Sequence, residues 1–552
     1  MDKRVIRKFY RYLAAGLLGL IALMLFGCDN TQNKPVDNAN KTLVIGNGAG
    51  QIPTLDPGKW SDNTSLRVIH DLFEGLVFET QQNKIIPGLA VTWAVSEDKK
   101  TYVFYLRKDA KWSNGKPVTA YDFEYAFKRN VDPKTGGQQV DVFRPIVNGN
   151  EIIAGKLPSS ALGVKALNAD TLEIKLAYPY PFFLESLLNP VTYPLYKPAI
   201  EKYGDAWTQV GKMISNGPYM LKEWVPNGHI LVKENPYYWD KKAIHIKQVK
   251  YLPMSSQTEY SQFLAGQVDM TYTVPSGFSK VQFEKRFGSE FINVPMLGTY
   301  FYWFNMKKPG VNNVAVRQAL TMVVDRNAIV QSILKLGQTP LYGQVPNDLQ
   351  GGIYKGLYLK LPSYQWVKWP MNRRIDYAKS LLTKAGFSAE HPLILTISFN
   401  TQESHKMVAE AIAQMWIRAF GDLVKVTLNN QEWKVYLQDL QNGNYDIGRM
   451  GGIATINEAS NFLESYLCGN VSNYGQFCND KLDKFYYQGM ASLTKKAYDE
   501  NMEKALLVAM KAYVTLPIYD YTYSRFVSNR VGGYDPQKNY MDSVYSKWFY
   551  FK

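Results

Sequence analysis

The alternation of apolar and polar positions predicts strands that alternate with helices along most of the chain. Short apolar or alternating runs bounded by Gly, Pro or Asn predict strands, and apolar residues spaced three and four apart predict helices. The predicted strands are 41–46, 101–107, 172–176, 268–272, 393–399, 423–428, 445–449 and 517–521, with one more in each of 216–224 and 230–239. The predicted helices are 66–76, 121–129, 260–266, 314–329, 375–385, 404–420 and 502–513, with another near 482. This alternation indicates α/β domains.

Two of these helices carry end signals. Thr119 can cap the N-terminus of the helix at 121–129, with Asp122 three residues later as its capping-box partner. Gly386 directly follows the helix at 375–385 and suits the left-handed position after a helix.

The stretch from Asn444 to Leu463 has an unusual pattern. A short strand, Tyr445 to Arg449, runs into the adjacent Gly451 and Gly452, and an irregular segment follows. Glycine has no Cβ, so another backbone or a ligand can approach closely. Two interpretations stay open at this point, a tight strand exit inside a core and the wall of a binding cleft.

Length and composition limit the classes of protein. A chain of 552 residues is too long for one core and predicts two to four domains. The aromatic content of 14% suits an extended recognition surface, although large β-rich domains also use many tyrosines. Of the net charge of +15, +4 precedes Cys28, and Lys and Arg are scattered through the rest of the chain rather than gathered into one stripe. Nucleic-acid binding needs a concentrated patch, so we expect none.

The N-terminus predicts export. Basic residues precede an apolar run, Leu13 to Phe26, and Gly27-Cys28 follows, so residues 1–27 are predicted to be a signal peptide. The end of this run resembles a bacterial lipobox, which implies cleavage before Cys28, acylation of its thiol and a tether over 28–40. Asp29 resembles a signal for retention at the inner membrane, on its periplasmic side, in a cell with two membranes. An uncleaved anchor helix is the alternative, and it also places the body outside the cytosol.

The two remaining cysteines are Cys468 and Cys478. Export permits a disulfide, and the turn-prone residues between the two cysteines can bring their ends together. Such a bond would stabilise the fold by roughly 2–3 kcal/mol. Two free thiols are the alternative.

Motifs for chemistry are missing from the sequence. The five histidines are far apart, and there is no His-Glu-x-x-His, no zinc-spaced Cys/His cluster, no Gly-x-Ser-x-Gly and no phosphate-binding Gly-rich loop. We therefore expect no metal, no cofactor and no enzymatic activity, with a secreted hydrolase or a chaperone as the less favoured alternative.

Several phrases, taken in order from Lys41 to the C-terminus, resemble one family. They are Trp112–Phe123 (WSNGKPVTAYDF), Asn216–Tyr219 (NGPY), Asn235–Trp239 (NPYYW), Phe263–Asp269 (FLAGQVD), Val316–Leu320 (VRQAL) with Asp325–Arg326, and Ala385–Phe387 (AGF). They resemble the solute-binding proteins of peptide-importing ABC transporters, extracellular family 5. The resemblance implies a two-lobed periplasmic-binding-protein fold with an extra domain: lobe I from 41–73, 196–297 and 523–552, inserted domain II from 74–195, and lobe III from 298–522. Crossovers near Leu297 and Thr522 would form the hinge.

The resemblance also implies a function and a site. The lobes would enclose an extended peptide and deliver it to the membrane subunits of an ABC permease, with the chain acting as a lipid-anchored monomer. The implied ligand-binding residues are Ser61, Asn63, Trp303, Asn400, His405, Trp433, Arg449, Gly451, Gly452, Ile453, Thr455 and Tyr521. For two of them a plainer interpretation stays open, because His405 could be a solvated residue in the first turn of a helix and Trp433 could be core packing.

Some positions depart from the pattern of the family. Its oligopeptide binders place an Asp at position 455 to pair with the peptide α-ammonium, and this chain has Thr455. They also have acidic residues at the positions of Ser61 and Trp303. Asp520 is no substitute, because it neighbours Tyr521 on a strand and points to the opposite face. We therefore hypothesise an atypical ligand: an N-blocked or acidic peptide, a cell-wall peptide, haem, or another solute with a carboxylate for Arg449.

Overall fold

The computed structural model describes residues 42–454, 456–492, 494–536, 539 and 542–552. The predicted signal peptide, Cys28, the tether over 28–40 and Thr455 lie outside the described residues.

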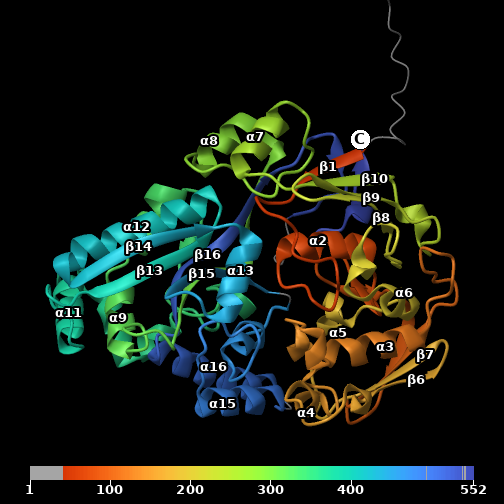
Figure 1. Ribbon diagram of the computed structural model, residues 1–552, viewed down its shortest axis with the longest axis horizontal. Helices are drawn as coiled ribbons and strands as arrows, with labels where there is room; N and C mark the ends of the chain where they lie inside the picture. The colour runs from red at the N-terminus through yellow and green to blue at the C-terminus, as the bar shows by residue number, and fades with distance from the viewer. Residues whose placement is uncertain (1–41, 455, 493, 537–538, 540–541) are drawn as a thin grey trace, which may run out of the picture. The chain divides into compact units, whose positions relative to one another are not determined.

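The first lobe is built on a four-stranded sheet of order β1-β10-β9-β8. The strands are β1 (Thr42–Gly46), β10 (Gln248–Leu252), β9 (His229–Glu234) and β8 (Tyr219–Val225). β1 pairs in parallel with β10, about two hundred residues later in the chain, and Figure 1 shows the red β1 beside β10, with β9 beyond it. Helix α2 (Asn63–Leu72) packs close to β8, and its N-terminus reaches the site described below.

The predicted strand at 268–272 is wrong. Met270 forms only single bridges to Ile45 and to Val527. Backbone bonds to β1 remain, since Asp269 N–H donates to Val44 O and Gly46 N–H to Met270 O, each at 2.8 Å, but the N–H of Val44 is accepted by the side chain of Asp269 at 2.9 Å and the ladder goes no further.

The inserted domain carries a second four-stranded sheet, β4-β5-β7-β6, against which α3 packs. Its elements are β4 (Ala90–Val95), β5 (Thr101–Leu106), β7 (Thr171–Lys175), β6 (Val164–Asn168) and α3 (Ala120–Val131). The predicted capping box at Thr119 and Asp122 is confirmed. The chain enters this domain after the first lobe begins and returns to the first lobe afterwards.

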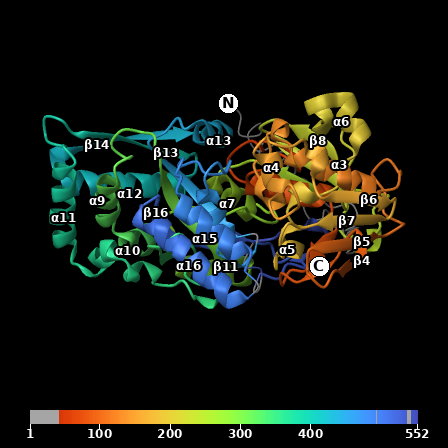
Figure 2. The same cartoon turned by 90° about the horizontal axis from the view of Figure 1, so that it is seen from below.

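The second lobe is built on a six-stranded mixed sheet of order β12-β16-β11-β15-β13-β14. The strands are β12 (Thr339–Pro340), β16 (Thr515–Phe526), β11 (Phe291–Phe304), β15 (Ile447–Ile453), β13 (Leu393–Asn400) and β14 (Val424–Gln431). Helix α12 (Glu403–Phe420) packs on β13 and β14, with its apolar face, including Val408, Ile412 and Trp416, fully buried. Figure 2 shows α12 beside these strands from a second direction.

The predicted helix at 314–329 is interrupted. α9 (Val314–Met322) ends before Val323, and α10 (Arg326–Ala328) begins a new helix. Asp325 caps α10 by accepting the N–H of Ala328 at 3.0 Å. The break also lets the buried Arg326 reach the carbonyl groups of Leu341 and Pro517, each at 2.8 Å.

The long strands β11 and β16 run from the second lobe toward the first. Leu297 and Thr522, the predicted crossover points, lie inside these two strands, and the pairing between the strands is interrupted from Pro295 to Thr299. The domain boundaries stay a prediction.

The remaining strands and helices are short or lie at the periphery of these sheets. They are β2 (Val77–Glu79), β3 (Ile85–Pro87), β17 (Val531–Gly532), β18 (Tyr550–Phe551), α4 (Gly149–Ile153), α5 (Phe183–Ser186), α6 (Lys197–Tyr203), α7 (Ser256–Leu264), α8 (Lys280–Phe287), α11 (Met371–Lys384), α13 (Trp433–Asn442), α14 (Ser460–Leu463), α15 (Asp480–Met490) and α16 (Lys495–Lys511). Gly386 follows α11 with a φ of 94°, as predicted. From residue 42 onward, every described helix is too short or too polar to span a bilayer.

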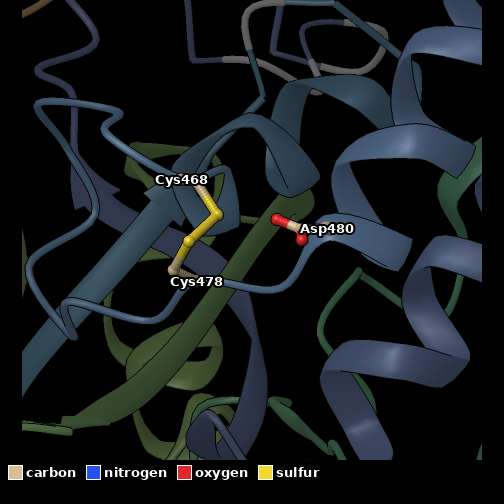
Figure 3. A group of neighbouring side chains, drawn as sticks. All are labelled: Cys468, Cys478 and Asp480. Atoms are coloured by element: carbon tan, nitrogen blue, oxygen red, sulfur yellow. A yellow bond between two sulfur atoms is a disulfide. The ribbon is translucent and has the colours of Figure 1, made fainter.

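A disulfide joins Cys468 and Cys478, with an S–S distance of 2.06 Å. Figure 3 shows the bonded sulfur atoms beside Asp480, the first residue of α15. These three side chains lie close enough together to resemble a metal site, but disulfide sulfurs are not thiolate ligands. The group is therefore structural, and the adjacent Asp483 accepts the N–H of Cys468 at 3.3 Å.

Candidate functional site

A cavity of about 420 Å³ lies between the two lobes and the inserted domain. The structure brings to its wall every ligand-binding residue predicted from the sequence in the described part of the chain. These are Ser61, Asn63, Trp303, Asn400, His405, Trp433, Arg449, Gly451, Gly452, Ile453 and Tyr521.

Strand β15 forms one wall of this cavity. The strand was predicted to stop at Arg449, and it instead continues through both glycines to Ile453, because Thr299 and Gly298 of β11 pair with Gly452 and Ile453. Its other neighbour, β13, pairs only as far as Gly448. Residues 449–453 therefore have no strand partner, among the described residues, on the side away from β11.

The adjacent glycines Gly451 and Gly452 of β15 serve different purposes. A Cβ on Gly451 would overlap the hydroxyl of Tyr521 and lie 2.9 Å from its ring. The atoms nearest to a Cβ on Gly452 would be those of Phe462 and Thr299, at 3.6 Å, an ordinary contact distance. Gly451 is thus required by a neighbouring side chain, whereas Gly452 leaves room at the cavity wall.

Arg449 is the principal cation of this wall. It is 7% exposed and stacks over the ring of Tyr300, 4.6 Å from the ring centroid. Its guanidinium donates to Asn400 Oδ1 at 3.3 Å and to the hydroxyl of Tyr521, while Nε has no partner. Among the described residues no carboxylate lies within ion-pair distance of it. A buried cation without a counter-charge is costly, so this position is suited to an anionic ligand group.

His405 and Trp433 lie on α12 and α13. His405 is buried, 5% exposed, so the interpretation of a solvated residue is wrong. Burial, and then the charge of Arg449, hold the pKa of His405 well below its ordinary value, so the ring is neutral at pH 7. His405 Nδ1 and Trp433 Nε1 both lack a hydrogen-bond partner within the described protein, and both residues line the cavity.

Trp303 and Asp520 are both largely buried. Trp303 is 1% exposed and packs against Phe301 and Tyr466, with ring centroids 5.5 and 5.1 Å apart. Asp520 does face away from the cavity: it accepts from Thr339 Oγ1 at 2.8 Å and from Asn347.

Sequence reasoning missed a cluster of charged residues on the cavity wall of the first lobe. Arg67 and Arg525 both donate to the carboxylate of Asp542, Arg67 at 2.7 Å and Arg525 at 2.6 and 2.7 Å. Two signals could have found it. Arg67 lies one helical turn after Asn63, and Arg525 follows Tyr521 with the alternation of a strand.

The family described as bacterial extracellular solute-binding proteins, family 5 Middle, matches residues 84–474. The chain belongs to this family. It has the two-lobed periplasmic-binding-protein fold that the sequence predicted.

Relatives within family 5 are similar over almost their whole length. The periplasmic oligopeptide-binding protein OppA of Salmonella typhimurium is 36% identical over 543 residues, covering 98% of each chain. The structure of Haemophilus influenzae OppA in complex with RPPGFSPFR is 35% identical, with a TM-score of 0.88, and the match covers 92% of this chain and 98% of that one.

Two structures of murein tripeptide-binding proteins named MppA bear on the arrangement of the lobes, the first of them from Escherichia coli, and each match covers 92% of this chain. Both are 34% identical to this chain. The first superposes with a TM-score of 0.87 and is matched over 98% of its length, whereas the unliganded open form, matched over 97%, gives a TM-score of only 0.61. The family 5 chain described here is therefore not in that open arrangement.

Proposed function

We propose that this family 5 protein is the substrate-binding component of a peptide ABC importer and encloses an extended peptide between its lobes. The observation that carries the proposal is the free side of β15. Backbone N–H and C=O groups of residues 450–453 border the cavity without a strand partner in the described chain, whereas the carbonyl of Arg449 already accepts from the hydroxyl of Tyr436 at 2.5 Å. An extended peptide can pair with such an edge through main-chain hydrogen bonds, which give affinity with little side-chain discrimination.

Arg449 supports the same proposal from its charge. A ligand carboxylate would provide the counter-charge that the described protein does not, and the neutral His405 beside it would add a hydrogen-bonding nitrogen. We propose that Arg449 binds a carboxylate of the peptide, at its C-terminus or on a side chain.

The proposal extends to the N-terminal segment. Its basic start, apolar run and Gly27-Cys28 support export, cleavage before Cys28 and acylation, with the mature monomer tethered on the periplasmic side of the inner membrane. Labelled palmitate should be incorporated into the wild-type protein and not into Cys28→Ser. An equally labelled Cys28→Ser protein would contradict the lipid anchor.

Calorimetry with tri- and tetrapeptides tests the binding function. We expect saturable one-to-one binding, a rise in melting temperature with peptide, and recovery of every peptide unchanged, since we propose a binder and not an enzyme. Mass spectrometry of material that copurifies with the protein identifies the natural ligand class. Binding only of a non-peptide solute, or peptide cleavage, would overturn the proposal.

A further inference from the structure

Glu464 occupies a distinctive position in the cavity. It begins a short 3₁₀ turn, Glu464–Tyr466, directly after α14, and it lines both the main cavity and a smaller side cavity of about 40 Å³. The side cavity lies between the inserted domain and the second lobe. Four tyrosines line it: Tyr178, Tyr180, Tyr486 and Tyr487.

Other carboxylates of the main cavity already have strong partners. Asp542 pairs with two arginines. Asp62 caps α2, accepting the N–H of Ser65 at 2.9 Å and its hydroxyl at 2.7 Å. Glu79 accepts from Asn83 and from the hydroxyl of Tyr545, each at 3.2 Å.

Among the described residues no cation lies within ion-pair distance of Glu464, as is also true of Asp62 and Glu79, but of these four carboxylates only Glu464 also lines the side cavity. Its hydrogen-bond partner is the neutral side chain of Asn461. The nearby Arg144 is held by Asp141 and by Asn150, whose Oδ1 lies 2.9 Å from Arg144 Nη1. Burial, and then the charge of Asp141, raise the pKa of Glu464 to about 8. The carboxyl is therefore largely protonated at pH 7 until a cation approaches.

We infer that Glu464 binds an ammonium group of the ligand at the mouth of the tyrosine-lined side cavity. An ammonium offers three N–H donors and no acceptor, which suits a carboxylate among tyrosine hydroxyls and ring faces. The side cavity has the size for such a head group or for one or two water molecules. The ammonium is either the peptide α-amino group or a lysine side chain.

This inference rests on the proposed peptide-binding function and changes one expectation. Thr455 suggested a cleft without an anchor for an amine, and Glu464 supplies a carboxylate from another position of the same cavity. The ligand would then carry its anionic group at Arg449 and its ammonium at Glu464.

The test uses four peptides, Ala-Ala-Ala and Ala-Lys-Ala, each with a free and an acetylated N-terminus. Calorimetry compares wild type, Glu464→Gln and the control Glu500→Gln, which removes an exposed carboxylate on α16. We expect Glu464→Gln to weaken binding of the ammonium-bearing peptides by about 10- to 100-fold and Glu500→Gln to leave it unchanged.

The peptides separate the two sources of the ammonium. A loss confined to free N-termini assigns Glu464 to the α-amino group, and a loss that persists in acetylated Ala-Lys-Ala assigns it to the side chain. Equal affinities of Glu464→Gln and wild type for all four would overturn the inference while leaving the binding function intact. If wild type binds none of them or any other peptide, the proposed function itself fails.

A measurement on the wild type alone stands if the variant does not fold. Binding of an ammonium to Glu464 at pH 7 should release close to one proton, which calorimetry in buffers of different ionisation enthalpy detects. Binding of the same peptide without proton release would overturn the inference.

Discussion

Replacing Arg449 by Gln provides the sharpest test of how the site recognises an anion. Gln retains the size and polarity of the wall near Asn400 and Tyr521 but removes the charge. In the ligand-free protein, the substitution deletes two hydrogen bonds and also a buried cation that has no described carboxylate partner. Removing an uncompensated buried charge offsets the lost bonds, so we expect the melting temperature to change little.

The effect on affinity follows from the burial of the guanidinium. Two unit charges 4 Å apart attract by about 4 kcal/mol at an effective dielectric of 20, but the ligand carboxylate loses its hydration on entering the cavity. The net value for a charge-assisted bond is therefore nearer to 1.5–3 kcal/mol. This corresponds to a loss of about 10- to 150-fold in affinity.

A double-mutant cycle isolates the free energy that the pairing of Arg449 with the ligand carboxylate contributes to binding. Wild type and Arg449→Gln are titrated with a peptide carrying a free carboxylate and with its amide, and Arg418→Gln, which changes an exposed arginine on α12, is the control. The variant should lose affinity for the carboxylate and bind the amide about as well as wild type does. The same loss for both peptides would refute the pairing of Arg449 with a ligand carboxylate.

Three further predictions concern the glycines, the disulfide and pH. Gly451→Ala should lower the free energy of unfolding by about 1–3 kcal/mol because its Cβ overlaps Tyr521, whereas Gly452→Ala should change this free energy by less than about 0.5 kcal/mol. Equal effects of the two substitutions in urea titrations would contradict the packing argument. The double substitution Cys468→Ser and Cys478→Ser, which opens a loop of sequence separation 10, should cost about 2.7 kcal/mol, and an unchanged denaturation midpoint would argue against it. The affinity of the protein for an N-acetylated, lysine-bearing peptide should rise by up to about tenfold per pH unit below pH 8 and then level off, because binding releases the proton that Glu464 holds in the free protein. Asp141 and Arg144 also face Glu464. A flat pH profile, identical to that of Glu464→Gln, would contradict the assignment of the lysine to Glu464.

Local sequence signals predicted most of the elements that frame the site. The strand-helix-strand unit β13, α12 and β14 was predicted within a few residues because its apolar spacing matches its buried positions. The failures have long-range causes. The segment 268–272 forms only single bridges, with the N–H of Val44 bonded to the Asp269 side chain. The helix at 314–329 breaks because Asp325 caps a second helix and Arg326 bonds to distant carbonyl groups.

The residues of the site also fall into two groups, those that the sequence could predict and those that only the folded chain brings together. The cavity residues predicted from the sequence came from a resemblance that carries positions over one by one. Arg67 and Asp542, which are 475 positions apart, meet only in the folded chain, and no local pattern pairs them. Glu464 follows an irregular stretch with no periodicity, so its place at the junction of two cavities depends on the packing of the inserted domain against the second lobe.

Away from strands β11 and β16, the described residues include these direct contacts between the lobes and the inserted domain. Gln51 N–H donates to Glu432 at 3.2 Å, Ser472 donates to the carbonyl of Gln138 at 3.3 Å, Asn470 bonds to Asp141, and the rings of Phe182 and Tyr498 lie 5.4 Å apart. Each hydrogen bond contributes only about 0.5–1.5 kcal/mol. Closure is opposed by the desolvation of Arg449, which is 7% exposed, and of the half-buried Glu464, until a ligand supplies partners for their charges.

A ligand that brings both a carboxylate and an ammonium removes both penalties at once, and it does so only when the lobes enclose it. The differential affinity that shifts the population toward the closed state therefore resides in these two charged contacts more than in the direct contacts between lobes. A variant lacking both charges, Arg449→Gln with Glu464→Gln, should close more readily without ligand and gain less from binding. Small-angle scattering of the free and peptide-saturated variant should then show a smaller difference in radius of gyration than the wild type shows.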